Sequence, residues 1–319
     1  MGSGGLLIIA AACSLFTRLP THPSLSISPA LSAWWYGVAL VCLLSGALLG
    51  VAMGWARVLP DELGWIKVAH SHLVVLGFVF LTVLGLMQGV LPTLLDAPLS
   101  SPSLTRTVFC LLPFGVLLLI SGLVLSKVLV QLAGGLVLGC GLLLCAWNVV
   151  RTWKSATQPA PPAFFHLLVS MGILLMMVVS GLLLAVNLQW TPPPVRVGQL
   201  HLLAYSHVFF IGFVLQSAFG LVMVALPLMI SKRHVKHHKK RRLFHAALVT
   251  RMERWSTLQL WSVNLGMLGL IAGAALVWWV PLKSPWIPLS AWISAFLLVI
   301  PIGLFTLKVV RLLGSTPEH

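Results

Sequence analysis

Four histidines lie at the starts of apolar stretches, where an ionisable side chain is costly and calls for a functional explanation. His70 and His72 stand two residues apart at the start of one stretch, and His201 and His207 stand at the start of another. For a single histidine in such a place, a hydrogen bond to a backbone carbonyl near the lipid headgroups is explanation enough. A matched pair of histidines would instead favour a shared ligand.

An internal repeat matches two of these histidines. Residues 69–92 align with residues 204–227 without a gap at an offset of 135, and ten of the 24 aligned positions are identical, among them His72 and His207. Two such copies predict two tandem four-helix units of the same orientation, a parallel repeat about an axis along the membrane normal. The two histidines are then expected at the same depth in the membrane.

The chemistry that suits such a pair is the binding of haem b. Imidazoles of His72 and His207 could bind the iron from opposite sides, while an apolar helical bundle buries the porphyrin. His70 points about 200° away from His72 on a regular helix, so the two cannot share a metal. His70 with His201 is the candidate for a second pair, and hence for a second haem. Small residues would let the macrocycle approach, and the repeat provides four: Gly77, Gly85, Gly212 and Gly220.

The elements that must position these residues are membrane-spanning helices. Hydrophobic residues make up 59% of the 319 positions and charged residues 8%, against about 25% charged in soluble domains. Long apolar runs without alternation exclude a barrel, so the fold class is all-α, a polytopic bundle of eight helices. The expected spans are 34–57, 66–91, 107–126, 130–150, 164–188, 200–228, 257–281 and 286–312. Polar residues inside the spans are expected to form hydrogen bonds between helices: Asn148, Asn187, Gln216 and Asn264.

Charge placement sets the expected orientation. The net charge is +15, but nine of the twenty Lys and Arg lie between Lys232 and Arg254. Such a cluster marks the cytoplasmic side and contacts anionic lipid, which speaks against a nucleic-acid partner. Counting helices back from it predicts both termini in the cytoplasm, with the four histidines toward the periplasm of a bacterial inner membrane. The expected parts are an N-terminal segment at 1–33, a first four-helix unit at 34–150, and a second at 151–319 with a basic cytoplasmic loop at 231–255.

The stretch from His70 and His72 through Gly77, Gly85 and Pro92 resembles the helix of haem-copper oxidase large subunits that carries an HxH pair. Its pattern is most similar to nitric oxide reductases and cbb3-type oxidases. The resemblance implies that His72 binds a low-spin haem, with His207 as the opposite ligand, and that His70 binds a high-spin haem. It covers about 25 residues of the stretch and its copy.

Departures from that family limit the function that the resemblance implies. The family has twelve or more helices and a cluster of further histidines for copper or iron, whereas this chain has eight spans and only His22-Pro23 as a His-Pro pair. Copper is therefore not expected. The five cysteines form no CxxC pattern, which excludes a zinc site, a redox dithiol and covalently attached c-type haem.

The expected function is that of a haem b electron-transfer subunit of an oxidoreductase complex. Its expected partners are other subunits or a periplasmic cytochrome c, and quinone is a candidate acceptor. Two other functions stay open: a haem-containing reductase of nitric oxide or oxygen that uses His70, and a non-redox transporter or structural subunit.

Overall fold

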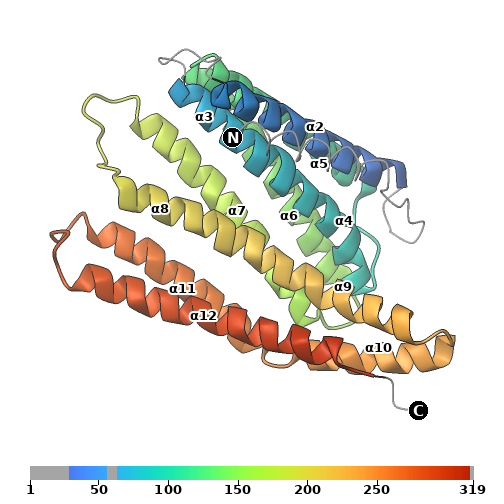
Figure 1. Ribbon diagram of the computed structural model, residues 1–319. Coiled ribbons are helices and arrows are strands. Elements are labelled where there is room, and N and C mark those ends of the chain that lie inside the picture. The colour runs from blue at the N-terminus through green and yellow to red at the C-terminus, as the bar shows by residue number, and fades with distance from the viewer. Residues whose placement is uncertain (1–28, 56–62, 317–319) are drawn as a thin grey trace. The chain divides into compact units, whose positions relative to one another are not determined.

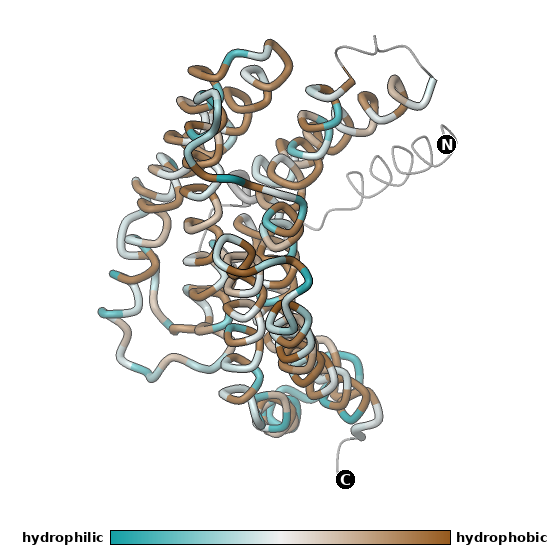
Figure 2. The backbone as a smooth tube through the Cα atoms, turned by 90° about the vertical axis from the view of Figure 1, so that its left-hand side faces the viewer, coloured by the Kyte–Doolittle hydropathy of each residue, from teal (hydrophilic) through white to brown (hydrophobic). Residues whose placement is uncertain are grey.

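The computed structural model describes residues 29–55 and 63–316, and every regular element in this part of the chain is a helix. Eight helical segments are long and apolar enough to cross a membrane, which confirms the predicted all-α fold of a multi-pass membrane protein. Figure 1 shows the helices, and Figure 2 shows apolar residues along most of their length. The segment at residues 1–28 and the break at residues 56–62 lie outside the described residues.

The helices agree with the expected spans to within a few residues at most ends. Five elements belong to the first half of the chain: α2 (Pro29–Gly54), α3 (Leu63–His72), α4 (Leu81–Leu95), α5 (Pro102–Val124) and α6 (Val128–Ser155). Six belong to the second: α7 (Pro162–Asn187), α8 (Gln199–His207), α9 (Gln216–His234), α10 (His238–Glu253), α11 (Ser256–Leu276) and α12 (Trp286–Leu313). Two π-helical segments, η1 (Leu73–Phe80) and η2 (Val208–Leu215), join α3 to α4 and α8 to α9.

Local signals explain where these helices begin and end. Ser101 is the N-cap of α5, where its side chain accepts a hydrogen bond from the Leu104 backbone N–H at 3.3 Å. Pro102 follows in the first turn, where a missing N–H costs nothing. Asp96 ends α4 in the left-handed conformation with φ 48°, which a short polar side chain tolerates. The connection between α9 and α11 was predicted as a basic loop, but most of it forms the helix α10.

The described chain divides into two compact units. The first ends at Gln158 and also includes Val178–Pro193, whereas the second comprises Pro159–Met177 and the chain from Pro194 onward. The second half of α7 therefore belongs to the first unit. Gly135 of α6 explains this assignment, because a Cβ there would lie 2.6 Å from the Leu182 side chain.

In each unit, one pair of consecutive helices forms a tightly packed hairpin. In the first unit, a Cβ on Gly122 of α5 would lie 2.5 Å from the backbone nitrogen of Gln131 in α6. In the second unit, a Cβ on Gly266 of α11 would lie 2.7 Å from Leu298 of α12. Small residues at helix contacts let backbones approach closely in membranes. The helices that carry the predicted histidines are not part of these hairpins.

Candidate haem-ligating histidines

The repeat seen in the sequence has a counterpart in the backbone beside His72 and His207. Each histidine is the last residue of an α-helix, and an eight-residue π-helical segment follows it directly, at Leu73–Phe80 and at Val208–Leu215. The two π segments are offset by the same 135 residues as the sequences. π-helical turns are rare, mostly short and frequent at functional sites.

The imidazoles of this pair are held in the same tautomer. Nδ1 of His72 lies 2.8 Å from the Val68 carbonyl oxygen, and Nδ1 of His207 lies 2.8 Å from the Leu203 carbonyl oxygen. A carbonyl oxygen can only accept, so Nδ1 is the donor in both bonds. In a neutral ring with this bond, Nε2 keeps its lone pair, which is the arrangement that metal-ligating histidines have in proteins. A neutral imidazole nitrogen on each ring fits haem iron.

His70 connects two helices. Its Nδ1 lies 2.7 Å from the Gly46 carbonyl oxygen of α2, and a Cβ on Gly50 would lie 3.1 Å from its ring. Tyr205, which stands at the equivalent position in the second copy, donates its hydroxyl to the Met177 carbonyl oxygen of α7 at 3.3 Å. Both side chains thus tie the histidine-bearing helix of a copy to the first helix of that copy.

His201 caps its own helix. Its Nδ1 accepts a hydrogen bond from the Gly198 backbone N–H at 3.1 Å, so the proton is on Nε2. Its ring stacks on Trp278 with centroids 4.8 Å apart. Nδ1 of His201 is therefore used within its own helix, and the pairing of His201 with His70 stays a prediction.

The four glycines expected beside a macrocycle instead lie against neighbouring helices. A Cβ on Gly77 would lie 2.5 Å from Cys42, and one on Gly85 would lie 3.2 Å from Trp35, both in α2. In the second copy, a Cβ on Gly212 would lie 2.5 Å from Met267, and one on Gly220 would lie 2.7 Å from Leu167. The expectation that these glycines make room for a porphyrin is wrong, because helix packing already uses the space.

The surroundings of His207 within the second unit are apolar. A cavity of about 130 Å³ lies between α8, α11 and α12, with Leu203, Gly269 and Gly273 in its lining beside His207. This volume is below the roughly 300 Å³ at which ligand pockets usually begin, so the cavity alone would not hold a porphyrin. Among the described residues, no group of three or more His, Cys, Asp or Glu could hold a metal ion.

Sequence reasoning missed a buried polar group in the second unit. His166 of α7 is fully buried, its ring lies edge-on to Phe219 at 6.0 Å, and neither ring nitrogen has a partner. Gln216 of α9 was expected to bond between helices, but it is fully buried and both its polar side-chain atoms lack a partner, so that expectation is wrong. His166 aligns with Leu31 at the offset of 135, so the repeat gave no signal for it.

Other polar residues of the spans form hydrogen bonds either to a neighbouring helix or within their own helix. Asn148 confirms the expected interhelical role, because its side chain bonds to the Ser101 backbone and to Thr105 of α5 at 2.9 to 3.2 Å. Asn264 instead donates to Leu260 of its own helix at 2.7 Å. Lys308 of α12 is 3% exposed and donates to Gln259 and Ser256 of α11 at 2.7 and 3.2 Å.

No protein-family model matches the chain, and no curated protein matches it either.

Proposed function

We propose that this chain is a b-type haem-binding membrane subunit that transfers electrons, and that His72 and His207 are the residues that would hold haem iron. The observation that carries the proposal is their shared geometry. Both rings donate Nδ1–H to a carbonyl four residues earlier, both keep a free Nε2, and both stand directly before a π-helical segment.

The chain's own residues would act by holding the imidazoles. The hydrogen bonds to the Val68 and Leu203 carbonyls fix the tautomer and the ring orientation, and they raise the basicity of Nε2 as a donor. Haem b, when bound, supplies one-electron redox chemistry, whose potential depends on the axial ligands and on burial. If both imidazoles held the iron, the group would favour electron transfer over reduction of nitric oxide or oxygen.

The proposed setting is a bacterial inner membrane with both chain ends in the cytoplasm. The cluster of Lys and Arg between Lys232 and Arg254 supports this orientation, because basic residues concentrate on the cytoplasmic side. The histidine pair would then lie toward the periplasm. A periplasmic cytochrome c or a partner subunit is the proposed electron donor, and quinone is the proposed acceptor. The resemblance of the HxH stretch to haem-copper oxidase large subunits supports the same assignment.

The test is an optical spectrum of the purified full-length chain, oxidised and then reduced with dithionite. We expect the bands of a low-spin b-type haem and a pyridine haemochrome near one haem per chain. His72→Ala and His207→Ala should each abolish the low-spin signal. His234→Ala is the matched control. Nδ1 of His234, the last residue of α9, makes the same bond to a carbonyl oxygen four residues earlier, that of Ile230, at 3.0 Å.

Three results would contradict the proposal. A well-folded preparation without haem bands would leave a transporter or structural subunit as the better reading. A low-spin signal that persists in both alanine variants would remove His72 and His207 as ligands. Carbon monoxide binding to the reduced wild-type protein would reveal an open coordination position and favour the reductase.

A further inference from the structure

We infer that the end of the second unit where α11 begins and α12 ends is a binding pocket for the phosphate of an anionic phospholipid. A cavity of about 500 Å³ lies there, and four basic side chains are part of its lining: Arg251, Arg254, Lys308 and Arg311. Among the described residues that line it, none is an aspartate or a glutamate. This inference does not depend on the proposed haem.

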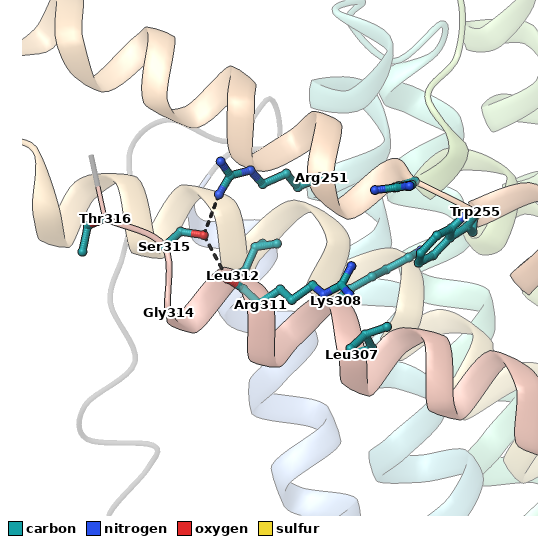
Figure 3. Close-up of a pocket in the computed structure, with 10 residues that line it drawn as sticks. Arg251, Trp255, Leu307, Lys308, Arg311, Leu312, Gly314, Ser315 and Thr316 are labelled. Atoms are coloured by element: carbon teal, nitrogen blue, oxygen red, sulfur yellow. Dashed lines mark hydrogen bonds between the residues drawn. The ribbon is translucent and has the colours of Figure 1, made fainter. Parts of the chain in front are cut away.

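The basic side chains are held in place. The Arg251 guanidinium donates to the Ser315 hydroxyl at 2.9 Å, and Ser315 donates to the Arg311 carbonyl oxygen at 2.9 Å, which ties the end of α12 to α10. Arg254 lies over the Trp255 ring, 4.4 Å from its centroid. Figure 3 shows Arg251 entering from α10 and Lys308 and Arg311 from α12, with dashed lines joining Ser315 to Arg251 and Arg311.

Lys308 makes this a formed site rather than a loose basic surface. It is 3% exposed, and two of its three N–H groups are used by Gln259 and Ser256. Because an ammonium has three donors, one is left on a residue that lines the cavity. Glu253, half-buried at the end of α10, also acts electrostatically on Lys308 but does not line the cavity.

Four like charges around one cavity repel each other, and a bound anion relieves that repulsion. Guanidinium groups bind phosphate with paired hydrogen bonds, which gives arginine an advantage at such sites. Trp255 adopts a left-handed backbone with φ 59° at the α10–α11 junction. Such strain in a non-glycine residue persists only where the surroundings hold it, and it is frequent at ligand clamps.

The position of the cavity favours a lipid as the source of the phosphate. Charged α10 cannot lie in the hydrocarbon region, so its junction with the membrane-spanning α11 lies at headgroup level. Apolar Trp255, Leu307 and Leu312 share the lining with the basic groups. A phosphodiester could sit on the cations while the acyl chains follow the apolar residues. Basic pockets between membrane helices bind lipid headgroups in this way.

The test measures retention of phosphatidylglycerol by the detergent-purified full-length chain, with native mass spectrometry and thermal shift. Arg251→Gln with Arg311→Gln removes two exposed charges and leaves buried Lys308 in place. At the usual attraction per basic residue, retention should weaken about 30-fold. Lys239→Gln with Arg242→Gln is the matched control, because it removes two exposed charges of α10 that do not line the cavity.

We expect phosphatidylglycerol to stabilise the wild type and the control pair, and phosphatidylcholine and inorganic phosphate to have little effect. Ser315→Ala keeps both arginines and should retain the lipid. Equal retention by the wild type and the Arg251/Arg311 variant would overturn the proposal, as would equal loss in the control pair. A shift by inorganic phosphate as large as that by the lipid would replace the lipid with a small soluble anion.

Discussion

Gly77 and Gly212 occupy equivalent positions in the two copies, yet we expect alanine to destabilise only the first copy strongly. A Cβ on Gly77 would lie 2.5 Å from Cβ of Cys42, an atom fixed to the α2 backbone. A Cβ on Gly212 would lie 2.5 Å from the terminal methyl and the sulfur of Met267, and 2.9 Å from Ile173. Methionine has three rotatable side-chain bonds and adapts to irregular space.

These distances set the expected magnitudes. Ordinary contact begins near 3.4 Å, so Gly77→Ala requires η1 and α2 to separate by on the order of 1 Å. Overpacking of this kind costs about 1–3 kcal/mol, and the better helix propensity of alanine returns about 1 kcal/mol at most. We therefore expect Gly77→Ala to reduce the free energy of unfolding by about 1–2 kcal/mol, and Gly212→Ala to change it by less than about 1 kcal/mol.

The assay is reversible unfolding in detergent, followed by far-UV circular dichroism, for both variants. Cys42→Gly removes the clashing Cβ, so a double-mutant cycle with Gly77→Ala should recover at least half of the loss beyond the cost of Cys42→Gly alone. Equal losses in Gly77→Ala and Gly212→Ala would refute the reasoning. Failure of Cys42→Gly to rescue Gly77→Ala would refute it as well.

The same unfolding assay tests three further predictions. His70→Phe and Tyr205→Phe should each cost about 1 kcal/mol through the lost bond between helices, while Ser71→Ala, whose bond stays within its helix at 2.9 Å, should cost less. Asn148→Leu should cost about 2–3 kcal/mol because buried groups of α5 lose their partners; an unchanged midpoint would contradict this. His166→Phe should stabilise the protein by about 1 kcal/mol, since a buried ring without partners becomes apolar; a loss of stability would show that His166 has a partner.

Apolar run length was sufficient to predict all eight spans, because a membrane helix must satisfy its own hydrogen bonds over a fixed thickness. Charge density gave a misleading signal for α10, since Lys239 to Arg242 were interpreted as a loop although a polar helix can form outside the hydrocarbon region. The π segments could not be predicted, because the hydrophobic pattern of Leu73–Phe80 is equally consistent with a regular helix. Any angle counted at 100° per residue across Leu73–Phe80 therefore fails.

The candidate site was only partly predictable for a different reason. The repeat identified His72 and His207 from sequence identity, but imidazole tautomers depend on partners that only coordinates reveal. His201 also lies near the start of an apolar stretch, yet its Nδ1 accepts a hydrogen bond from Gly198, whereas Nδ1 of His72 and His207 donates. Lys308 bonds to Ser256 and Gln259, whereas the ring nitrogens of His166 have no partner. Both outcomes depend on packing between helices, and no sequence spacing predicts them.

Three features coincide at His72 and His207, and no other described histidine has all of them. The residue is identical in both copies, Nδ1 donates to a carbonyl four residues earlier, and a π segment begins at the next position. His70 aligns with Tyr205 and His201 aligns with Ile66, so both lack the identity. His234 makes the same hydrogen bond, but it aligns with Leu99 and ends α9 without a π segment. Long π-helical segments are rare, and two of them follow histidines that make the same hydrogen bond. This is the strongest reason to look for a ligand at these two rings.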